Sequence, residues 1–235
     1  QSETFDITRM DLDAWMNNAE EQEDEETGRK YWVGYGDVDD VGDERRIQMM
    51  VYTGEGDDRQ VDHIFVGYRE TASGEFEAKY RVDYTYEGDT LKETLKYDIS
   101  GDTDVLVERS VYEGSGDDSN IKTVITYDRN GVITRRRDYK YEDGVLKETL
   151  FYETNSEQEG QGELIERTVF KGEKDKEVSD YSQSFYDRAI TQTTVYLYHD
   201  GKRAEDLDGE EYRYSRSGQI TFKGDSDTNG DGEIS

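Results

Sequence analysis

The chain has 235 residues, with 58 acidic and 29 basic side chains, which gives a formal net charge of −29 at pH 7. It has no cysteine, which excludes disulfides, thiolate metal sites and thiol catalysis, and its charge disfavours binding to nucleic acid or anionic membranes. No apolar run approaches the roughly 18 residues that a membrane-spanning helix needs. The charge suits a secreted or cell-surface protein in water that contains divalent cations or high salt, although it also serves solubility alone.

Residues 1–45 predict one helix and an acidic linker. The helix is expected in ITRMDLDAWMNNAEEQ, where four apolar residues share one face at helical spacing: Leu12, Trp15, Met16 and Ala19. The run EEQEDEETGRK is typical of a solvated linker. The stretch GYGDVDDVG at residues 34–42 lacks a lysine and a following helix, so it predicts a loop rather than a phosphate site.

Residues 46–223 predict three β repeats, which span 46–105, 106–163 and 164–223. The segment RVDYTYEGDTLKETLKYD begins at Arg81, and RRDYKYEDGVLKETLFYE begins at Arg136; eleven of their eighteen letters coincide without gaps. A weaker copy, TTVYLYHDGKRAED, begins at Thr193. The segments RIQMMVY, LVERSVY and LIERTVF are likewise similar, and each lies at the start of one repeat.

Each repeat predicts about four strands, because apolar or aromatic residues recur at every second position. In the second repeat the expected strands are LVERSVY, IKTVITY, VITRRRDYKY and VLKETLFY. The turn signals GSGDD, RNG and EDG separate them, and Asn-Gly and Asp-Gly supply the positive φ angles of tight hairpins. We therefore expect a mainly β fold, an elongated antiparallel meander of about twelve strands, preceded by the short N-terminal helix.

The predicted strand faces are unusually polar. Arg135 and Arg137 fall on the same side as Tyr139 and Tyr141, whereas one face of an ordinary sandwich is aliphatic. This pattern predicts a thin or elongated sheet, held by cross-strand tyrosine, threonine and ion pairs worth about 0.2–1 kcal/mol each. Stability then comes from stacking many similar hairpins, as in other repeat proteins.

The sequence offers little support for catalysis. The two histidines, His63 in a predicted strand and His199 in a predicted turn, fit surface or packing roles. No nucleophile elbow, zinc spacing or phosphate loop is present, and with 58 acidic residues any pair of carboxylates is an arbitrary choice for a glycosidase. We expect a protein that is not an enzyme.

The segment 224–235 predicts part of a calcium site. Its last nine letters, DTNGDGEIS, match the front of a twelve-residue calcium loop. Oxygen ligands fall at loop positions 1, 3, 5, 7 and 9, which are Asp227, Asn229, Asp231, Glu233 through its carbonyl, and Ser235 through water. The carboxylate that closes such a loop at position 12 is not in this segment.

The start of the chain supplies that position. If Gln1 follows Ser235, the string becomes DTNGDGEISQSE, and Glu3 falls at position 12 with the predicted helix after it. Two arrangements fit this pattern: one unit of a longer tandem polypeptide, or separate subunits that meet head to tail. In both, calcium lies at the junction between units, and heterologous contacts that do not close generate open filaments.

The recurring hairpin YxYxxxGxL resembles the tyrosine-rich repeats of RHS/YD proteins and of very large bacterial surface proteins. It is carried by Tyr84, Tyr86, Tyr139, Tyr141, Tyr196 and Tyr198, with turns at Gly144 and Gly201. The C-terminal segment resembles the EF-hand loop, especially that of dockerin modules. The hairpin resemblance implies an extracellular β-repeat protein, with no reaction attached.

These observations favour a non-enzymatic structural subunit of an extracellular filament or surface assembly, joined head to tail to copies of itself with calcium at the junction. A secreted glycan-binding β module is one alternative, because aromatic faces stack on sugars, although Trp15 and Trp32 are the only tryptophans. A cellulosome-type protein with a truncated dockerin is another, and it predicts a second calcium loop beyond residue 235 and no self-assembly.

Overall fold

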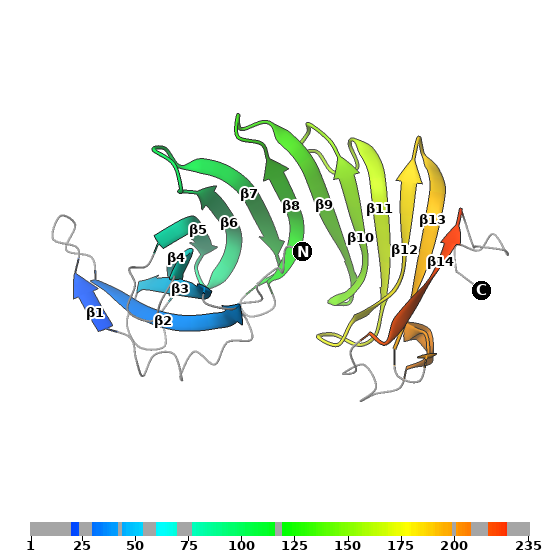
Figure 1. Cartoon of the computed structure of the whole chain (residues 1–235), viewed down its shortest axis with the longest axis horizontal. Coiled ribbons are helices and arrows are strands. Elements are labelled where there is room, and N and C mark those ends of the chain that lie inside the picture. The colour runs from blue at the N-terminus through cyan, green and yellow to red at the C-terminus, as the bar shows by residue number, and fades with distance from the viewer. Residues whose placement is uncertain are drawn as a thin grey trace. The chain divides into compact units, whose positions relative to one another are not determined.

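The computed structural model is mainly β, and the prediction of an antiparallel meander is confirmed. It describes residues 20–23, 30–41, 44–53, 60–69, 77–115, 119–198, 201–207 and 216–224. The strands within these ranges number fourteen and lie in the sheet in chain order, so the sheet is an open meander (Figure 1). Twelve of them, β3–β14, come from the segment predicted to hold about twelve strands.

The chain divides into two compact units, Gln1–Val107 and Glu108–Ser235, and the boundary falls within β7 (Val105–Glu113). The strands of the first unit are β1 (Glu20–Glu23), β2 (Lys30–Val41), β3 (Glu44–Thr53), β4 (Gln60–Arg69), β5 (Glu77–Glu87) and β6 (Thr90–Asp98). Neighbouring strands from β1 to β6 all pair antiparallel.

The second unit continues the meander in the same way. After β7 its strands are β8 (Asn120–Tyr127), β9 (Ile133–Glu142), β10 (Val145–Glu153), β11 (Glu163–Lys171), β12 (Val178–Tyr186), β13 (Ala189–Leu197) and β14 (Gly218–Lys223). The four strands predicted for the second repeat match β7 to β10 to within one residue at each end. A single 3-10 turn, η5 (Ala204–Asp206), lies between β13 and β14.

The segment before β3 differs from its prediction. β1 and β2 are strands where the composition predicted a linker and a loop, and β2 pairs with β3 along its length. A neighbouring strand supplies backbone hydrogen bonds that outweigh the weak local preferences of Gly and Asp, because β propensity depends on context. The predicted N-terminal helix lies outside the described residues, apart from its last positions, which belong to β1. Within the described ranges, no helix has the length and apolar character that a membrane crossing requires.

Tight turns fix the register of the hairpins. β9 and β10 are joined by Asp143 and Gly144, whose φ angles of 51° and 78° confirm the turn that EDG predicted. β12 and β13 are joined by Asp187 and Arg188, with φ angles of 48° and 64°. The sequence did not signal this second turn, because it contains no glycine and arginine is uncommon at positive φ.

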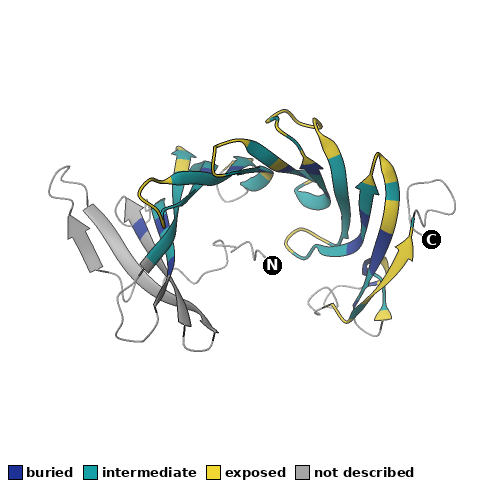
Figure 2. Ribbon diagram, turned by 45° about the horizontal axis from the view of Figure 1, so that its top comes forward, coloured by how far each residue is buried: buried dark blue, intermediate teal, exposed yellow. Residues whose placement is uncertain are grey.

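Few residues of the described part are buried (Figure 2). About half of the buried side chains are polar or charged. Its buried apolar side chains are Val51, Ile64, Ile125, Tyr152, Tyr181, Val195, Tyr198, Ala204 and Leu207. Its buried polar and charged side chains are Thr94, Ser110, Thr123, Arg136, Asp138, Thr149, Asp180, Gln183, Thr193 and Thr194. Nearly all of them lie within strands, so the contacts of each side chain with its cross-strand neighbours decide how it is buried.

Candidate functional site

The predicted calcium ligands all lie outside the described residues. They are Glu3, Asp227, Asn229, Asp231, Glu233 and Ser235. The calcium site therefore stays a prediction. In the ranges that the structure describes, no group of three or more His, Asp or Glu side chains is placed to hold a metal ion.

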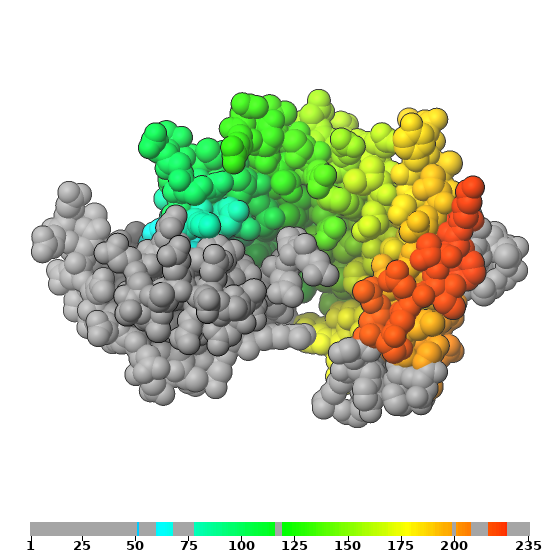
Figure 3. Space-filling view, in the orientation of Figure 1, coloured from blue at the N-terminus to red at the C-terminus, as the bar shows by residue number. Residues whose placement is uncertain are grey.

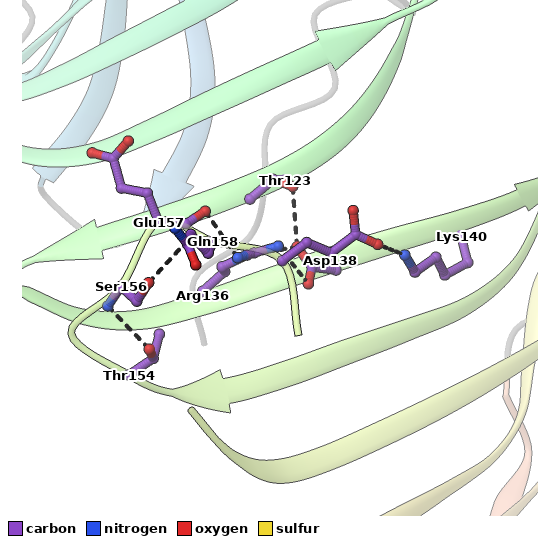
Figure 4. A network of polar contacts seen from close by, with 9 residues as sticks. Thr123, Arg136, Asp138, Lys140, Thr154, Ser156, Glu157 and Gln158 are labelled. Carbon is purple, nitrogen blue, oxygen red and sulfur yellow. Dashed lines mark hydrogen bonds and ion pairs between the residues drawn. The ribbon is translucent and has the colours of Figure 1, made fainter. Parts of the chain in front are cut away.

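The most completely built polar cluster of the described chain is centred on Arg136 and Asp138, two residues apart on β9 (Figure 4). The Arg136 Nε donates to Asp138 Oδ1 at 2.8 Å, and Nη2 donates to Oδ2 at 2.9 Å. Thr123 on β8 lies opposite Asp138 and donates its hydroxyl to Asp138 Oδ1 at 3.0 Å. Such a bidentate pair combines charge with fixed geometry.

The loop between β10 and β11, residues 154–162, closes over this pair. The third arginine donor, Arg136 Nη1, binds the Glu157 carbonyl at 2.9 Å. The loop is also held to the sheet by its own ends and side chains: the Thr154 amide donates to the Thr134 carbonyl at 3.2 Å, and the Glu157 carboxylate pairs with Arg109 at 3.1 Å. With the loop in place, the side chains of Arg136 and Asp138 are only 2% and 3% exposed.

The first repeat carries the same arrangement. Arg81 and Asp83, which align with Arg136 and Asp138, pair through Nε–Oδ1 at 2.8 Å and Nη2–Oδ2 at 3.2 Å. The Nη1 of Arg81 again contacts the loop after the following strand, here the Asp104 carboxylate at 2.7 Å. These three contacts raise the pKa of Arg81. We call this arrangement, in which a strand residue also binds the segment after the next strand, the clamp. The side chains of Arg81 and Asp83 are 29% and 37% exposed, so the clamp of the first repeat is more solvated than that of the second.

The third repeat replaces the ion pair with neutral side chains. At the aligned positions on β13 stand Thr193 and Val195, both buried. Val195 packs with Tyr181, Val169 and Leu197 in an apolar cluster. The Thr193 hydroxyl donates to the Gly224 carbonyl at 2.9 Å, just after the following strand. In all three repeats, the residue at this aligned position therefore connects its own strand to the segment that follows the next strand.

The clamp at Arg136 and Asp138 holds the β10–β11 loop against β9, and its polar atoms are too enclosed to contact a substrate. Nε and both Nη nitrogens of the Arg136 guanidinium bind acceptors within the protein, and the carboxylate of Asp138 is enclosed with them. The sequence alone did not single the pair out, because Arg and Asp at alternate strand positions are ordinarily solvent-facing. The available signal was the identity of both residues in the RVDY and RRDY copies.

Cations from neighbouring strands, and Arg216 from the segment just before β14, cover the faces of several aromatic rings. The guanidinium of Arg137 lies 4.7 Å from the ring centre of Phe151, which is directly opposite on β10, and Arg135 lies 5.9 Å from the same ring. Arg216 lies 4.9 Å from the ring of Tyr196. In the first unit two further rings are covered in this way, by Lys96 over Tyr80 and by Arg81 over Tyr97. Each contact is worth about 0.5–1 kcal/mol at an exposed site.

Four tyrosines of the second unit have raised pKa values. Burial raises the pKa of Tyr139, and burial with the nearby Tyr139 and Glu177 raises that of Tyr141. Burial also raises the pKa of Tyr152 and Tyr198. In each case removal from water disfavours the charged phenolate, so these rings serve the fold in their neutral form.

A second buried ion pair lies near η5. Arg203 Nη2 donates to Asp180 Oδ2 at 2.9 Å, and Arg203 Nη1 pairs with Glu205 at 2.7 Å. Asp180 is 1% exposed and its other oxygen, Oδ1, has no hydrogen-bond partner. Next to it Tyr198 donates its hydroxyl to the Ser179 carbonyl at 2.7 Å. The pair anchors the long β13–β14 connection to β12.

Of the two histidines, His63 is the one that the structure describes. The Nδ1 of His63 lies 2.9 Å from the Asp62 carboxylate, and its ring meets Phe65 edge-on at 5.0 Å between centres, which fits the packing role expected for it. His199 lies outside the described residues. A shallow groove lies beside the β10–β11 loop, and Glu153 is the single charged residue among those that line it: Ile133, Thr134, Glu153, Thr154, Asn155, Ser156, Gln161 and Gly162.

No known protein family model matches the chain, and no curated protein sequence matches it.

Proposed function

We propose that the chain is a non-enzymatic structural β-repeat subunit of an extracellular filament or surface assembly. The observation that carries the proposal is the clamp that recurs from repeat to repeat, at Arg81, Arg136 and Thr193. Each clamp ties a strand to the segment that follows the next strand, so each repeat is fastened locally. Stability that adds up along the chain is the property that elongated repeat proteins use.

Calcium at the junction between units is the second part of the proposal. It rests on the sequence pattern from Asp227 to Ser235 and on Glu3 as the closing carboxylate. A divalent ion would neutralise acids where two chains of net charge −29 meet, which lowers the repulsion that otherwise opposes assembly. The resemblance to tyrosine-rich surface repeats supports the extracellular location.

The glycan-binding alternative is weaker because of the cations that cover the rings. A sugar stacks on a free aromatic face, whereas Tyr80, Tyr97, Phe151 and Tyr196 each have a face occupied by Arg or Lys from a neighbouring position. The cations instead tie adjacent strands together. This arrangement favours a structural role for the aromatic residues.

Electron microscopy of the purified chain, first with calcium and then with chelator, tests the proposal. We expect filaments with calcium that are lost on chelation. The variant Glu3→Gln removes the bidentate ligand and should abolish them. The matched control is Glu233→Gln, which should assemble normally because position 7 of the loop binds calcium through its backbone carbonyl.

Other outcomes point to the alternatives. Monomers that bind glycans with or without calcium would select the glycan-binding module. Monomers that bind calcium without assembling would favour the truncated dockerin. Filaments that persist in chelator, or that form equally well in Glu3→Gln, would contradict calcium at the junction.

A further inference from the structure

β14 is the last strand that the structure describes, and no described strand covers its outer edge, whereas the equivalent edge of the preceding repeat is covered. In the strand order β14 neighbours only β13, and no other described strand pairs with it. Five of its six residues are exposed, including Ile220 at 48% and Phe222 at 43%. In Figure 3, β14 (red) lies on the visible surface of the molecule.

The register identifies the equivalent strand in the second repeat. On β9 and β10, Asp138 is opposite Leu150 and Arg136 is opposite Tyr152. On β13 and β14 the aligned pairs are Val195 with Ile220 and Thr193 with Phe222. β14 therefore occupies the place of β10, and Phe222 stands where β10 has Tyr152.

The two strands differ in whether a further strand lies beside them. β10 is paired on its far side with β11, Tyr152 is 8% exposed, and Glu153 is the only exposed residue of that strand. The same strand position is thus buried when the first strand of another repeat lies beside it and exposed when none does. An open edge that carries apolar side chains is a template for pairing with a further strand.

We propose that the β14 edge binds an extended segment of the β11 type, the first strand of another repeat unit, by addition to the sheet. The sequence of β11 is ELIERTVFK (Glu163–Lys171), and LVERSVY on β7 is of the same kind. Backbone hydrogen bonds would supply affinity, and the side chains at alternate positions would supply specificity. This inference rests on the proposed structural role and names the surface through which a further repeat is added.

The charges on β14 favour a β11-type strand as its partner, in the register of the β10–β11 pair. In the β10–β11 pair, Leu164 is opposite Tyr152 and Glu163 is opposite Glu153, a like-charge pair. The residue of β14 that corresponds to Glu153 is Lys223, one place beyond Phe222, and it is opposite Gln192 on β13. In the same register a β11-type strand would place its leucine on Phe222 and its first glutamate on Lys223. Opposite charges face each other there, where the intact repeat has two acids.

The test adds a synthetic peptide of sequence ELIERTVFK to the full-length, isotopically labelled chain in the presence of chelator. We expect 1:1 binding and amide shifts confined mainly to β14, and no binding of a scrambled peptide of the same composition. Phe222→Glu should weaken binding about tenfold or more, because it removes the apolar contact and places a charge opposite leucine. Val132→Glu is the matched control, since Val132 is 51% exposed in the β8–β9 turn.

The inference is overturned if the peptide leaves the β14 amides unshifted, or if both variants bind it equally. It is also overturned if the chain alone forms a dimer in which two β14 edges protect each other. The chelator separates this test from that of the proposed function. Peptide binding without filaments would count against the assembly alone, and calcium-dependent filaments without peptide binding would count against the β14 edge alone.

Discussion

Arg136 and Asp138 stand two residues apart on β9 and bind each other through two contacts of 2.8 and 2.9 Å, with almost no exposure to solvent. Consecutive residues on one face of a strand are often neighbours, but a fully enclosed ion pair between them is unusual because two charges must leave water. The cost is offset by the carbonyl of Glu157 and the hydroxyl of Thr123. The stability of the second unit therefore depends on this pair and on the loop above it.

Removing one partner of the pair should destabilise the second unit strongly. Asp138→Val leaves the Arg136 guanidinium buried with its charge unpaired, which we expect to cost about 3–5 kcal/mol of unfolding free energy. Arg136→Met together with Asp138→Val should recover more than half of that loss, because two apolar side chains need no compensation. Urea denaturation measures both. If the double variant is no more stable than the single one, the unpaired charge is not the cause.

The aligned pair in the first repeat should tolerate the same change. Asp83→Val removes a partner from Arg81, but this pair is about one-third exposed and water can solvate the guanidinium. Asp104 also remains as a second acceptor. We expect a loss of about 0–1 kcal/mol. Hydrogen exchange should show near-normal protection of β5 in this variant, against clear loss of protection of β9 in Asp138→Val. Equal losses would mean that burial does not set the cost.

Gly162 should be much less replaceable than Gly160 in the same loop. Both have positive φ, 116° and 70°, but a Cβ at Gly162 would lie 2.5 Å from the Glu153 carbonyl oxygen, whereas at Gly160 it would meet nothing within 4 Å. Gly160→Ala should cost about 1 kcal/mol for the left-handed backbone. Gly162→Ala should cost clearly more and displace the loop from Arg136. Thermal unfolding and the Arg136 side-chain resonances report the two effects, and equal costs would contradict the steric argument.

The sheet should lose stability at alkaline pH through its buried phenols. The pKa values of Tyr139, Tyr141, Tyr152 and Tyr198 are raised above the ordinary value of 10.0. The folded chain therefore holds these protons more tightly than the unfolded chain. Their contribution is full below about pH 10 and is lost as the pH rises through the folded-state values. Tyrosinate absorbance should show delayed titration of these groups, followed by unfolding.

Tyr141→Phe provides the control for that titration. The variant has one phenol fewer to ionise, so its stability should fall less steeply above pH 10 than that of the unaltered chain. At neutral pH the two should unfold alike to within about 1 kcal/mol, because a phenylalanine keeps the ring contacts. An identical alkaline slope in both proteins would show that Tyr141 does not contribute.

Local patterns in the sequence were enough to predict β7 to β10 and the turn at Asp143 and Gly144. Alternation within a strand and the φ preference of a turn residue involve only neighbours along the chain. The same patterns missed β1 and β2, whose Glu, Gly and Asp residues have low strand preference by themselves. They also missed the turn at Asp187 and Arg188. In those places pairing with another strand outweighs local preference.

Local sequence patterns could not predict the clamp at Arg136 and Asp138. An Arg or Asp on a strand is expected to face water. No residue next to 136–138 in the sequence indicates that the β10–β11 loop, which begins sixteen residues after Asp138, encloses the pair. The repeat marked both positions as special, since Arg and Asp recur at an offset of 55 residues, but it did not say why. The contacts from Arg136 to Glu157 and from Arg81 to Asp104 give the reason.

Most strand positions, and the order of the strands as successive antiparallel hairpins, can be read from the amino acids alone, because strand alternation and turn chemistry act over a few residues. Which charges are buried, which rings are covered by cations and which edge is left open become visible only in three dimensions. Those properties depend on segments far apart in the chain meeting in space, as the β10–β11 loop meets Arg136, and burial is set by such contacts rather than by residue type.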